Sequence, residues 1–91
     1  GEIDIVAKKD NFIAVVEVKS ALVDRFTQSE FAPELHVNRQ KQRKLIKLGQ
    51  YYMASHKNLT DKAWEIDVVA VEINPYGLYE IRHWQQAVTS S

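Results

Sequence analysis

Three residues that could do chemistry, Asp4, Glu17 and Lys19, stand in two apolar, β-branched segments near the start of the chain. The segments cover residues 1–7 and 12–19, and the short polar break between them is typical of a β-hairpin. Two carboxylates and a lysine can share a proton, form ion pairs or bind a divalent cation. The chemistry therefore depends on whether the hairpin brings these side chains together.

The turn sets the register of this hairpin. Residues 10–11, Asp-Asn, tolerate the positive φ of a two-residue type I′ loop. Counting back from such a loop places Asp4 opposite Glu17 and Glu2 opposite Lys19. Because side chains alternate along a strand, the four polar groups then emerge on one face. The other face receives apolar residues only: Ile3, Ile5, Ala7, Ala14, Val16 and Val18.

Asp4 and Glu17 should not remain bare carboxylates in this position. Like charges opposed across strands are destabilising, and these strands are apolar enough to be buried on both faces. A shared proton, Lys19 or a divalent cation could neutralise the pair. Lys19 also lies opposite Glu2, so one lysine leaves excess negative charge. We therefore favour the cation.

Composition narrows the class of protein. A chain of 91 residues forms one small domain. Twelve Lys and Arg balance twelve Asp and Glu, so net charge alone argues for no polyanionic partner. Cysteine is absent, which excludes disulfides and thiolate sites and fits a reducing compartment. No apolar run approaches the roughly 20 residues of a membrane span, so we expect a cytoplasmic protein without a membrane segment.

A helix is predicted from Arg39 to about His56, after Asn38 as N-cap. At about 100° per residue, Lys41 is in line with the apolar stripe of this helix and therefore points inward at the first turn. The other basic residues of the helix lie on its outer side: Arg43, Lys44 and Lys47.

The remaining segments complete a crossover fold. The segment 20–37 reads as a loop and 64–73 as a buried strand, followed by a type I turn at 74–77, a partner strand at 78–84 and a short helical turn in the tail. Strand, loop, helix and strand in this order join parallel neighbours. The predicted fold is α/β, a mixed sheet with an N-terminal β-hairpin, one crossover helix and a C-terminal β-hairpin. One helix leaves the other sheet face bare, so we expect missing N-terminal sequence or a homodimer to cover it.

The motifs in this order resemble a known superfamily. Gly1 to Asp4 followed by Val16 to Lys19 is similar in spacing to the PD-(D/E)xK nucleases, which include restriction endonucleases and archaeal Holliday junction resolvases. Within that superfamily the chain most resembles the UPF0102, or YraN-like, family, through Lys41 to Leu45, Ile66 to Val69 and His83 to Ala87. That family has a helix and a strand before its first motif, and neither is present here, so we expect a fragment of a restriction-endonuclease-like domain.

The resemblance implies a metal-dependent endonuclease acting on nucleic acid, expected to be structured or branched DNA. Asp4 and Glu17, with the carbonyl of Val18, would hold Mg²⁺ or Mn²⁺. Lys19 would orient water or neutralise developing charge, and Glu2 would ligate a second ion or restrain Lys19.

The basic helix would contact the phosphates of this substrate. Lys41 lies at the positively polarised start of the helix, where a phosphate binds well. Weaker phosphate contacts are expected from Arg43, Lys44 and Lys47, although a basic outer face is also typical of a solvated helix.

The same residues also allow interpretations without catalysis. Asp4, Glu17 and Lys19 can form a strand end closed by salt bridges, and Glu2 a simple cross-strand pair with Lys19. The rival functions are a non-catalytic nucleic-acid-binding module with the same fold and a structural or dimerising domain. Asp67 is expected to cap or pair near the start of its buried strand. The histidines share no metal-ligand spacing, which predicts structural or surface roles for His36, His56 and His83.

Overall fold

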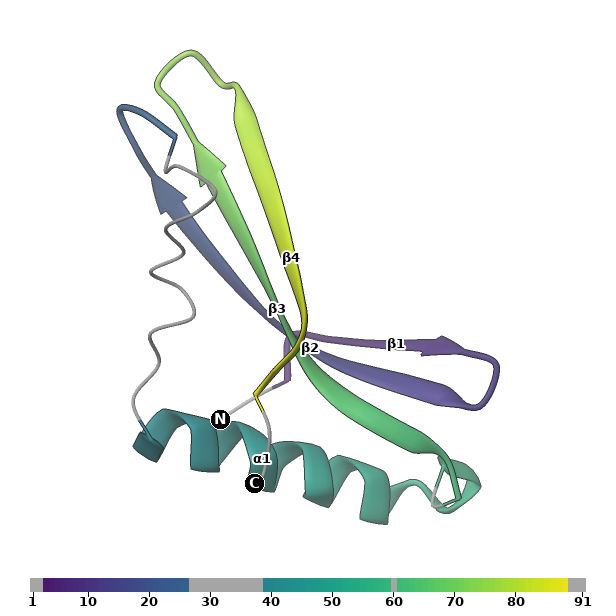
Figure 1. The fold of residues 1–91 in the computed structure, drawn as a ribbon. Coiled ribbons are helices and arrows are strands. Elements are labelled where there is room, and N and C mark those ends of the chain that lie inside the picture. Colours follow the sequence, from purple (N-terminus) through teal and green to yellow (C-terminus); the bar gives the residue numbers. More distant parts are fainter. Residues whose placement is uncertain (1–2, 27–38, 60, 89–91) are drawn as a thin grey trace.

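A computed structural model describes residues 3–26, 39–59 and 61–88. In these ranges the chain forms one four-stranded mixed sheet with one long helix on one side of it (Figure 1). The predicted α/β fold, with two hairpins joined through a crossover helix, is confirmed. The elements are β1 Ile5–Lys9, β2 Phe12–Leu22, α1 Arg39–Ser55, η2 Lys57–Leu59, β3 Ala63–Ile73 and β4 Tyr79–Val88.

The first hairpin has the predicted register. β1 and β2 are antiparallel, with Lys9 opposite Phe12 and a two-residue turn between them. Asp10 has a φ of 54°, whereas Asn11 does not have positive φ. A type I′ turn needs positive φ at both central residues, so the predicted length of the turn is right and its predicted type is wrong.

Each strand of this hairpin extends further at its C-terminal end than the sequence predicts. β1 runs to Lys9, so Lys8 and Lys9 belong to the strand instead of the turn. β2 continues through Ser20 to Leu22, because residues 20–22 pair with the end of β3. Pairing with a neighbouring strand outweighs the weak intrinsic preference of these residues. Residues 23–26 of the predicted loop are described and form no strand or helix, whereas its remainder, 27–37, and the predicted N-cap Asn38 lie outside the described residues.

The crossover joins two parallel strands. β2 pairs with β3 over its whole length, from Phe12 opposite Ala63 to Leu22 opposite Ile73. The connecting helix α1 matches the predicted range to within one residue at its end. No helix in the described part of the chain combines the length and the apolar character that a membrane crossing needs.

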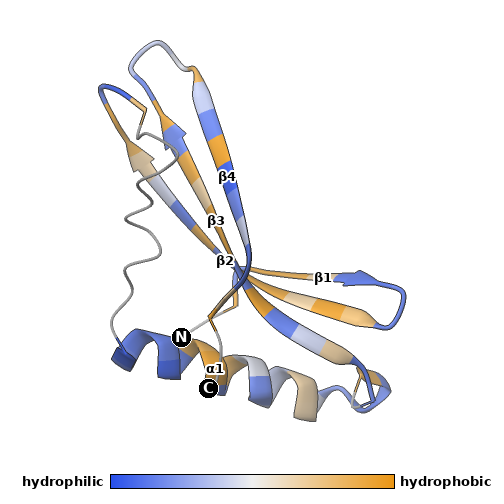
Figure 2. Cartoon of the chain, viewed as in Figure 1, coloured by the Kyte–Doolittle hydropathy of each residue, from blue (hydrophilic) through white to orange (hydrophobic). Residues whose placement is uncertain are grey.

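The core lies between α1 and the sheet. Ile13 and Val15 of β2 pack with Met53 of α1, and Trp64 of β3 packs against this cluster. Apolar residues concentrate in the middle of α1, where the helix runs beneath the strands (Figure 2). A Cβ atom on Gly49 would overlap the ring of Trp64, so the close approach of helix and sheet requires glycine at this position.

A tight turn closes the second hairpin. The N–H of Gly77 donates to the carbonyl of Asn74 over 3.0 Å, which confirms the predicted β-turn. The side chain of Asn74 also accepts hydrogen bonds from the N–H groups of Tyr76 and Leu78, each over 3.0 Å. Gly77 has a φ of 81°, a conformation that glycine adopts without steric cost.

The predicted helical turn in the tail is wrong, because β4 continues to Val88. Its register with β3 shifts between Ile66 and Val68, where Gln86 has a φ of 50°. The N–H of Gln86 donates to Oδ1 of Asp67 over 3.0 Å. This bond holds a bulge in the strand, and beyond it the buried side chain of Val88 lies opposite Ile66.

In the described part of the chain no helix covers the sheet face away from α1, as predicted, although Val16 and Asp67 on this face are buried. Leu22, Tyr79 and Ile81 lie on this face and are 86%, 67% and 56% exposed. The first hairpin is therefore not buried on both faces, since Ile5 is 51% exposed. Ile3 is another departure, because it packs against the core on the α1 side.

Candidate functional site

Asp4 and Glu17 both line one small pocket beside α1. Leu45 and Leu48 of the helix line the same pocket. Glu17 is two residues beyond the core residue Val15 on β2, so alternation along the strand turns it to the same face. Asp4 directly precedes β1, whose pairing with β2 begins at Ile5 opposite Val16. The structure thus brings the two predicted residues to one pocket.

A backbone hydrogen bond fixes Asp4 next to β2. The N–H of Val18 donates to Oδ2 of Asp4 over 2.9 Å. The bond uses one carboxylate oxygen and holds the side chain against the strand that carries Glu17. Asp4 is therefore positioned before any ligand binds.

Glu17 forms an ion pair with the start of the helix. Nζ of Lys41 lies 3.6 Å from Oε1 of Glu17, and the two side chains are 46% and 19% exposed. Lys41 thus reaches toward the sheet, as its alignment with the apolar stripe predicts, while keeping nearly half of its surface in solvent. Lys19 was the lysine expected to neutralise the carboxylates, and the Lys41–Glu17 pair was not predicted. The inward position of Lys41 on the helix was the available signal.

Lys19 lies on the same face, two residues further along β2 and half-buried. It lines a groove of about 270 Å³ with Glu72 and Arg82. Nη1 of Arg82 donates to Oε1 of Glu72 over 2.9 Å, and both of these side chains are 8% exposed. This buried ion pair was not predicted from the sequence, where only the position of Glu72 within an apolar strand indicates it.

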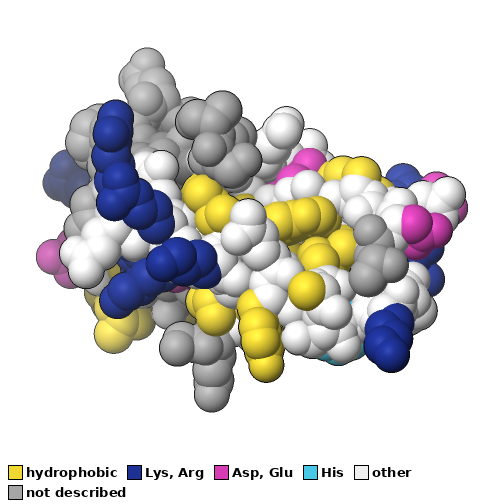
Figure 3. All heavy atoms as spheres, turned by 90° about the horizontal axis from the view of Figure 1, so that it is seen from below, with side chains coloured by type: hydrophobic (Ala, Val, Ile, Leu, Met, Phe, Trp, Pro, Cys, Tyr) yellow, Lys and Arg dark blue, Asp and Glu magenta, His cyan; other side chains and the backbone are white. Residues whose placement is uncertain are grey.

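The other basic residues of α1 are exposed, as predicted. Figure 3 shows Lys and Arg side chains gathered over the start of the helix. The helix contains no acidic residue in the 17 positions from Arg39 to Ser55. The resulting surface, which we call the basic helix face, is made by Lys41, Arg43, Lys44 and Lys47.

The ligand atoms that Asp4 and Glu17 offer are of the type that a hard divalent cation such as Mg²⁺ prefers. Two carboxylates and the neighbouring carbonyl of Val18 offer oxygen ligands only, and Mg²⁺ is commonly held by one or two carboxylates with water and substrate phosphates completing its shell. Glu2, the fourth predicted ligand, lies outside the described residues. Within the described ranges, no three His, Asp or Glu side chains are grouped so that they could hold a metal ion. Water and substrate would therefore have to supply the remaining ligands.

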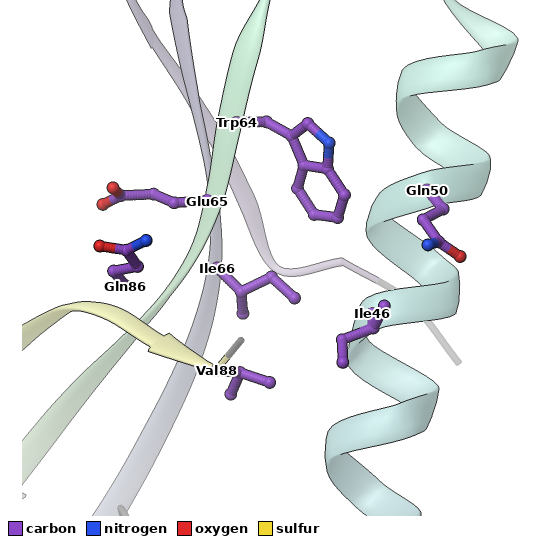
Figure 4. Close-up of a pocket in the computed structure, with 7 residues that line it drawn as sticks. All are labelled: Ile46, Gln50, Trp64, Glu65, Ile66, Gln86 and Val88. Carbon is purple, nitrogen blue, oxygen red and sulfur yellow. The ribbon is translucent and has the colours of Figure 1, made fainter. Parts of the chain in front are cut away.

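A second cluster of ionisable groups lies on the opposite face of the sheet. Asp67 is only 2% exposed, and its Oδ2 accepts a hydrogen bond from Nε2 of His83 over 2.8 Å. The expectation that Asp67 pairs near the start of its buried strand is confirmed, and its partner His83 lies on the neighbouring strand β4. Figure 4 shows Glu65 pointing away from α1, whereas Trp64 and Ile66 on either side of it point toward the helix.

The two carboxylates of this cluster titrate differently. A hydrogen bond with Asp67, burial and the charge of Asp67 raise the pKa of Glu65 to about 6. Burial favours a higher pKa for Asp67, but hydrogen bonds from Glu65, the N–H of Gln86 and His83 hold it below 3.8. Glu65 thus keeps its proton more readily, and Asp67 carries the negative charge that His83 meets.

The remaining described histidine has a structural role, as predicted. Nδ1 of His56 donates to the carbonyl of Tyr52 over 2.8 Å, and the two rings stack with centroids 4.0 Å apart. His36 lies outside the described residues.

The sequence of this chain is similar to those of known proteins. The model of the uncharacterised protein family UPF0102 matches residues 1–86. A UPF0102 protein of Thermodesulfovibrio yellowstonii is 46% identical over 71 residues, which cover 78% of this chain and 58% of that protein. UPF0102 proteins of Petrotoga mobilis and Clostridium beijerinckii are 35% and 38% identical, over 78% and 81% of this chain and 59% and 56% of their own lengths. The chain thus spans less than two thirds of the length of these relatives, and it belongs to the UPF0102 family.

Proposed function

We propose that this chain carries the metal site of a nuclease of the PD-(D/E)xK type, which hydrolyses phosphodiester bonds in nucleic acid, expected to be structured or branched DNA. The observation that supports it most is the meeting of Asp4 and Glu17 in one pocket, beside the basic start of α1. Membership in the nuclease superfamily and a cytoplasmic location are parts of the same proposal.

Each residue of the site has a role in this proposal. Asp4 and Glu17, with the carbonyl of Val18, would hold Mg²⁺ or Mn²⁺. When bound, such an ion supplies a Lewis acid for a phosphoryl oxygen and lowers the pKa of bound water. The N–H of Val18 holds Asp4 in place beforehand, which reduces the reorganisation that binding requires. Lys19, on the same face of β2, would orient water or neutralise developing charge.

The basic helix face would position the substrate. Lysine and arginine side chains contact nucleic acid mainly through its phosphates, without reading sequence. Binding should therefore weaken as salt concentration rises, because cations released from the nucleic acid drive the association. We expect the affinity for DNA to be salt-sensitive and little dependent on base sequence.

A cleavage assay tests the proposal. The chain is incubated with four-way-junction and linear DNA in Mg²⁺ or Mn²⁺, alongside Asp4→Asn and Glu17→Gln. Asp10→Asn is the matched control, because it removes the same charge at the far end of the hairpin and asparagine tolerates positive φ. We expect cleavage by the wild type and the control, and its loss in the two site variants with circular dichroism unchanged. Wild-type cleavage rates in Asp4→Asn would refute the proposal.

The ion pair between Lys41 and Glu17 favours a second candidate function, a module that keeps the fold without cleaving. In that case the salt bridge closes the strand end, and the basic helix face only binds. A pure binder keeps its salt-sensitive affinity for DNA in Asp4→Ala, because the basic helix face is unchanged. The affinity can also increase, because a carboxylate that repels the phosphates is gone. A structural or dimerising domain shows neither cleavage nor salt-sensitive binding.

A further inference from the structure

Lys41 already pairs with Glu17, one of the two carboxylates that would have to bind the metal ion. Its Nζ lies 3.6 Å from Oε1 of Glu17, within the range of an ion pair but longer than a charge-assisted hydrogen bond. The lysine stem is flexible, and its side chain is 46% exposed. Such contacts are weak and exchange readily.

Glu17 is the less exposed partner, at 19%, so its charge is the one that needs a nearby cation. A divalent ion bound to the same carboxylate would repel the ammonium group, since like charges a few ångströms apart interact strongly near a protein surface. Both cations therefore compete for Glu17.

We infer that Lys41 is an exchangeable counter-ion of the site: it neutralises Glu17 before a divalent ion binds, and then turns to a phosphate of the substrate. This inference rests on the proposed function and adds a regulatory step to it. Binding of the ion would release Lys41 for the substrate, so ion and phosphate would bind cooperatively. The first turn of α1 allows the movement, because nearly half of the side chain is already in solvent.

Titration calorimetry with Mn²⁺ alone tests the competition. The variants are Lys41→Met and, as a matched control, Lys9→Met. The control removes the same charge from an exposed position at the far end of the first hairpin, outside the basic helix face. We expect Lys41→Met to bind Mn²⁺ about two- to fivefold more tightly than the wild type, the range that a partly exposed ion pair can supply. Lys9→Met should keep the wild-type affinity.

A second titration follows the released lysine. With Mn²⁺ saturating, thymidine monophosphate should bind Lys41→Met more weakly than it binds the wild type or Lys9→Met. Without Mn²⁺ the three proteins should bind it alike, because Lys41 then stays on Glu17.

The outcomes separate the inference from the proposed function. Wild-type binding of Mn²⁺ with equal affinities in Lys41→Met and Lys9→Met would refute the inference and leave the metal site standing. If none of the three proteins binds Mn²⁺, both fail. Binding by Lys41→Met alone would support the competition most directly.

Discussion

At the scale of single residues, the cluster around Asp67 makes stability depend on pH. The folded-state pKa of Glu65 is about 6, above its ordinary value of 4.5, so the folded protein binds more protons than the unfolded chain between these values. The stabilisation from Glu65 is fully present below pH 4.5 and is lost as pH rises through 6. Asp67 acts in the opposite sense, since its lowered pKa stabilises the fold above 3.8 and this contribution is lost as pH falls.

Urea unfolding of the wild type and Glu65→Gln, from about pH 4 to about pH 8, isolates the first effect. We expect the wild type to lose free energy of unfolding relative to the variant as pH rises through about 6, with a constant difference at higher pH. A difference that does not change with pH would show that Glu65 titrates at its ordinary value.

The buried pair of Arg82 and Glu72 gives a second residue-scale prediction. Both side chains are 8% exposed, and removing one partner of such a pair leaves a buried charge without that partner. We expect Arg82→Met to lower the free energy of unfolding by about 3 kcal/mol. The double variant Arg82→Met/Glu72→Leu should regain most of this loss, because it leaves neither charge buried. A loss below about 0.5 kcal/mol in the single variant would place the pair among ordinary surface ion pairs.

At the scale of elements, the packing of α1 on β3 depends on Gly49. In an exposed helix, replacing glycine by alanine stabilises by roughly 1 kcal/mol. Here the added Cβ would overlap the ring of Trp64, so Gly49→Ala should destabilise the fold instead. Thermal unfolding should show a lower midpoint for Gly49→Ala and no lower midpoint for Ser55→Ala, a change at the exposed end of the same helix. A higher midpoint for Gly49→Ala would contradict the described helix–sheet contact.

Local signals in the sequence predicted the elements and the first register well. The two residues of the 10–11 turn fixed which strand positions face each other, and the apolar stripe of α1 fixed its length and the side on which Lys41 lies. Both signals depend on residues that are close in sequence. They could therefore be interpreted before the strands were placed.

Features that depend on pairing between distant segments could not be predicted in this way. Gln86 has no strand preference of its own, and its place in β4 depends on a hydrogen bond to Asp67, nineteen residues away. The extension of β2 to Leu22 likewise depends on β3. The Lys41–Glu17 pair requires the crossover to bring the start of α1 to the end of the hairpin.

At the scale of the whole molecule, the two faces of the sheet differ. One face holds α1, the core and the candidate site, and the other exposes Leu22, Tyr79 and Ile81 in the described part of the chain. The homodimer expected from the sequence stays a prediction. If a second copy covers the bare face, sedimentation should show a dimer at micromolar concentration that Ile81→Lys converts to a monomer. A monomer in both proteins would contradict it.

The proposed nuclease function requires that Asp4 and Glu17 bind one divalent ion between them. Its most direct test is a crystal of the chain soaked in Mn²⁺, with the anomalous signal measured around these two carboxylates. We predict one peak within coordination distance of both side chains and of the carbonyl of Val18, and its disappearance in crystals of Asp4→Asn. A soaked wild-type crystal with both carboxylates ordered and no peak between them would contradict the account.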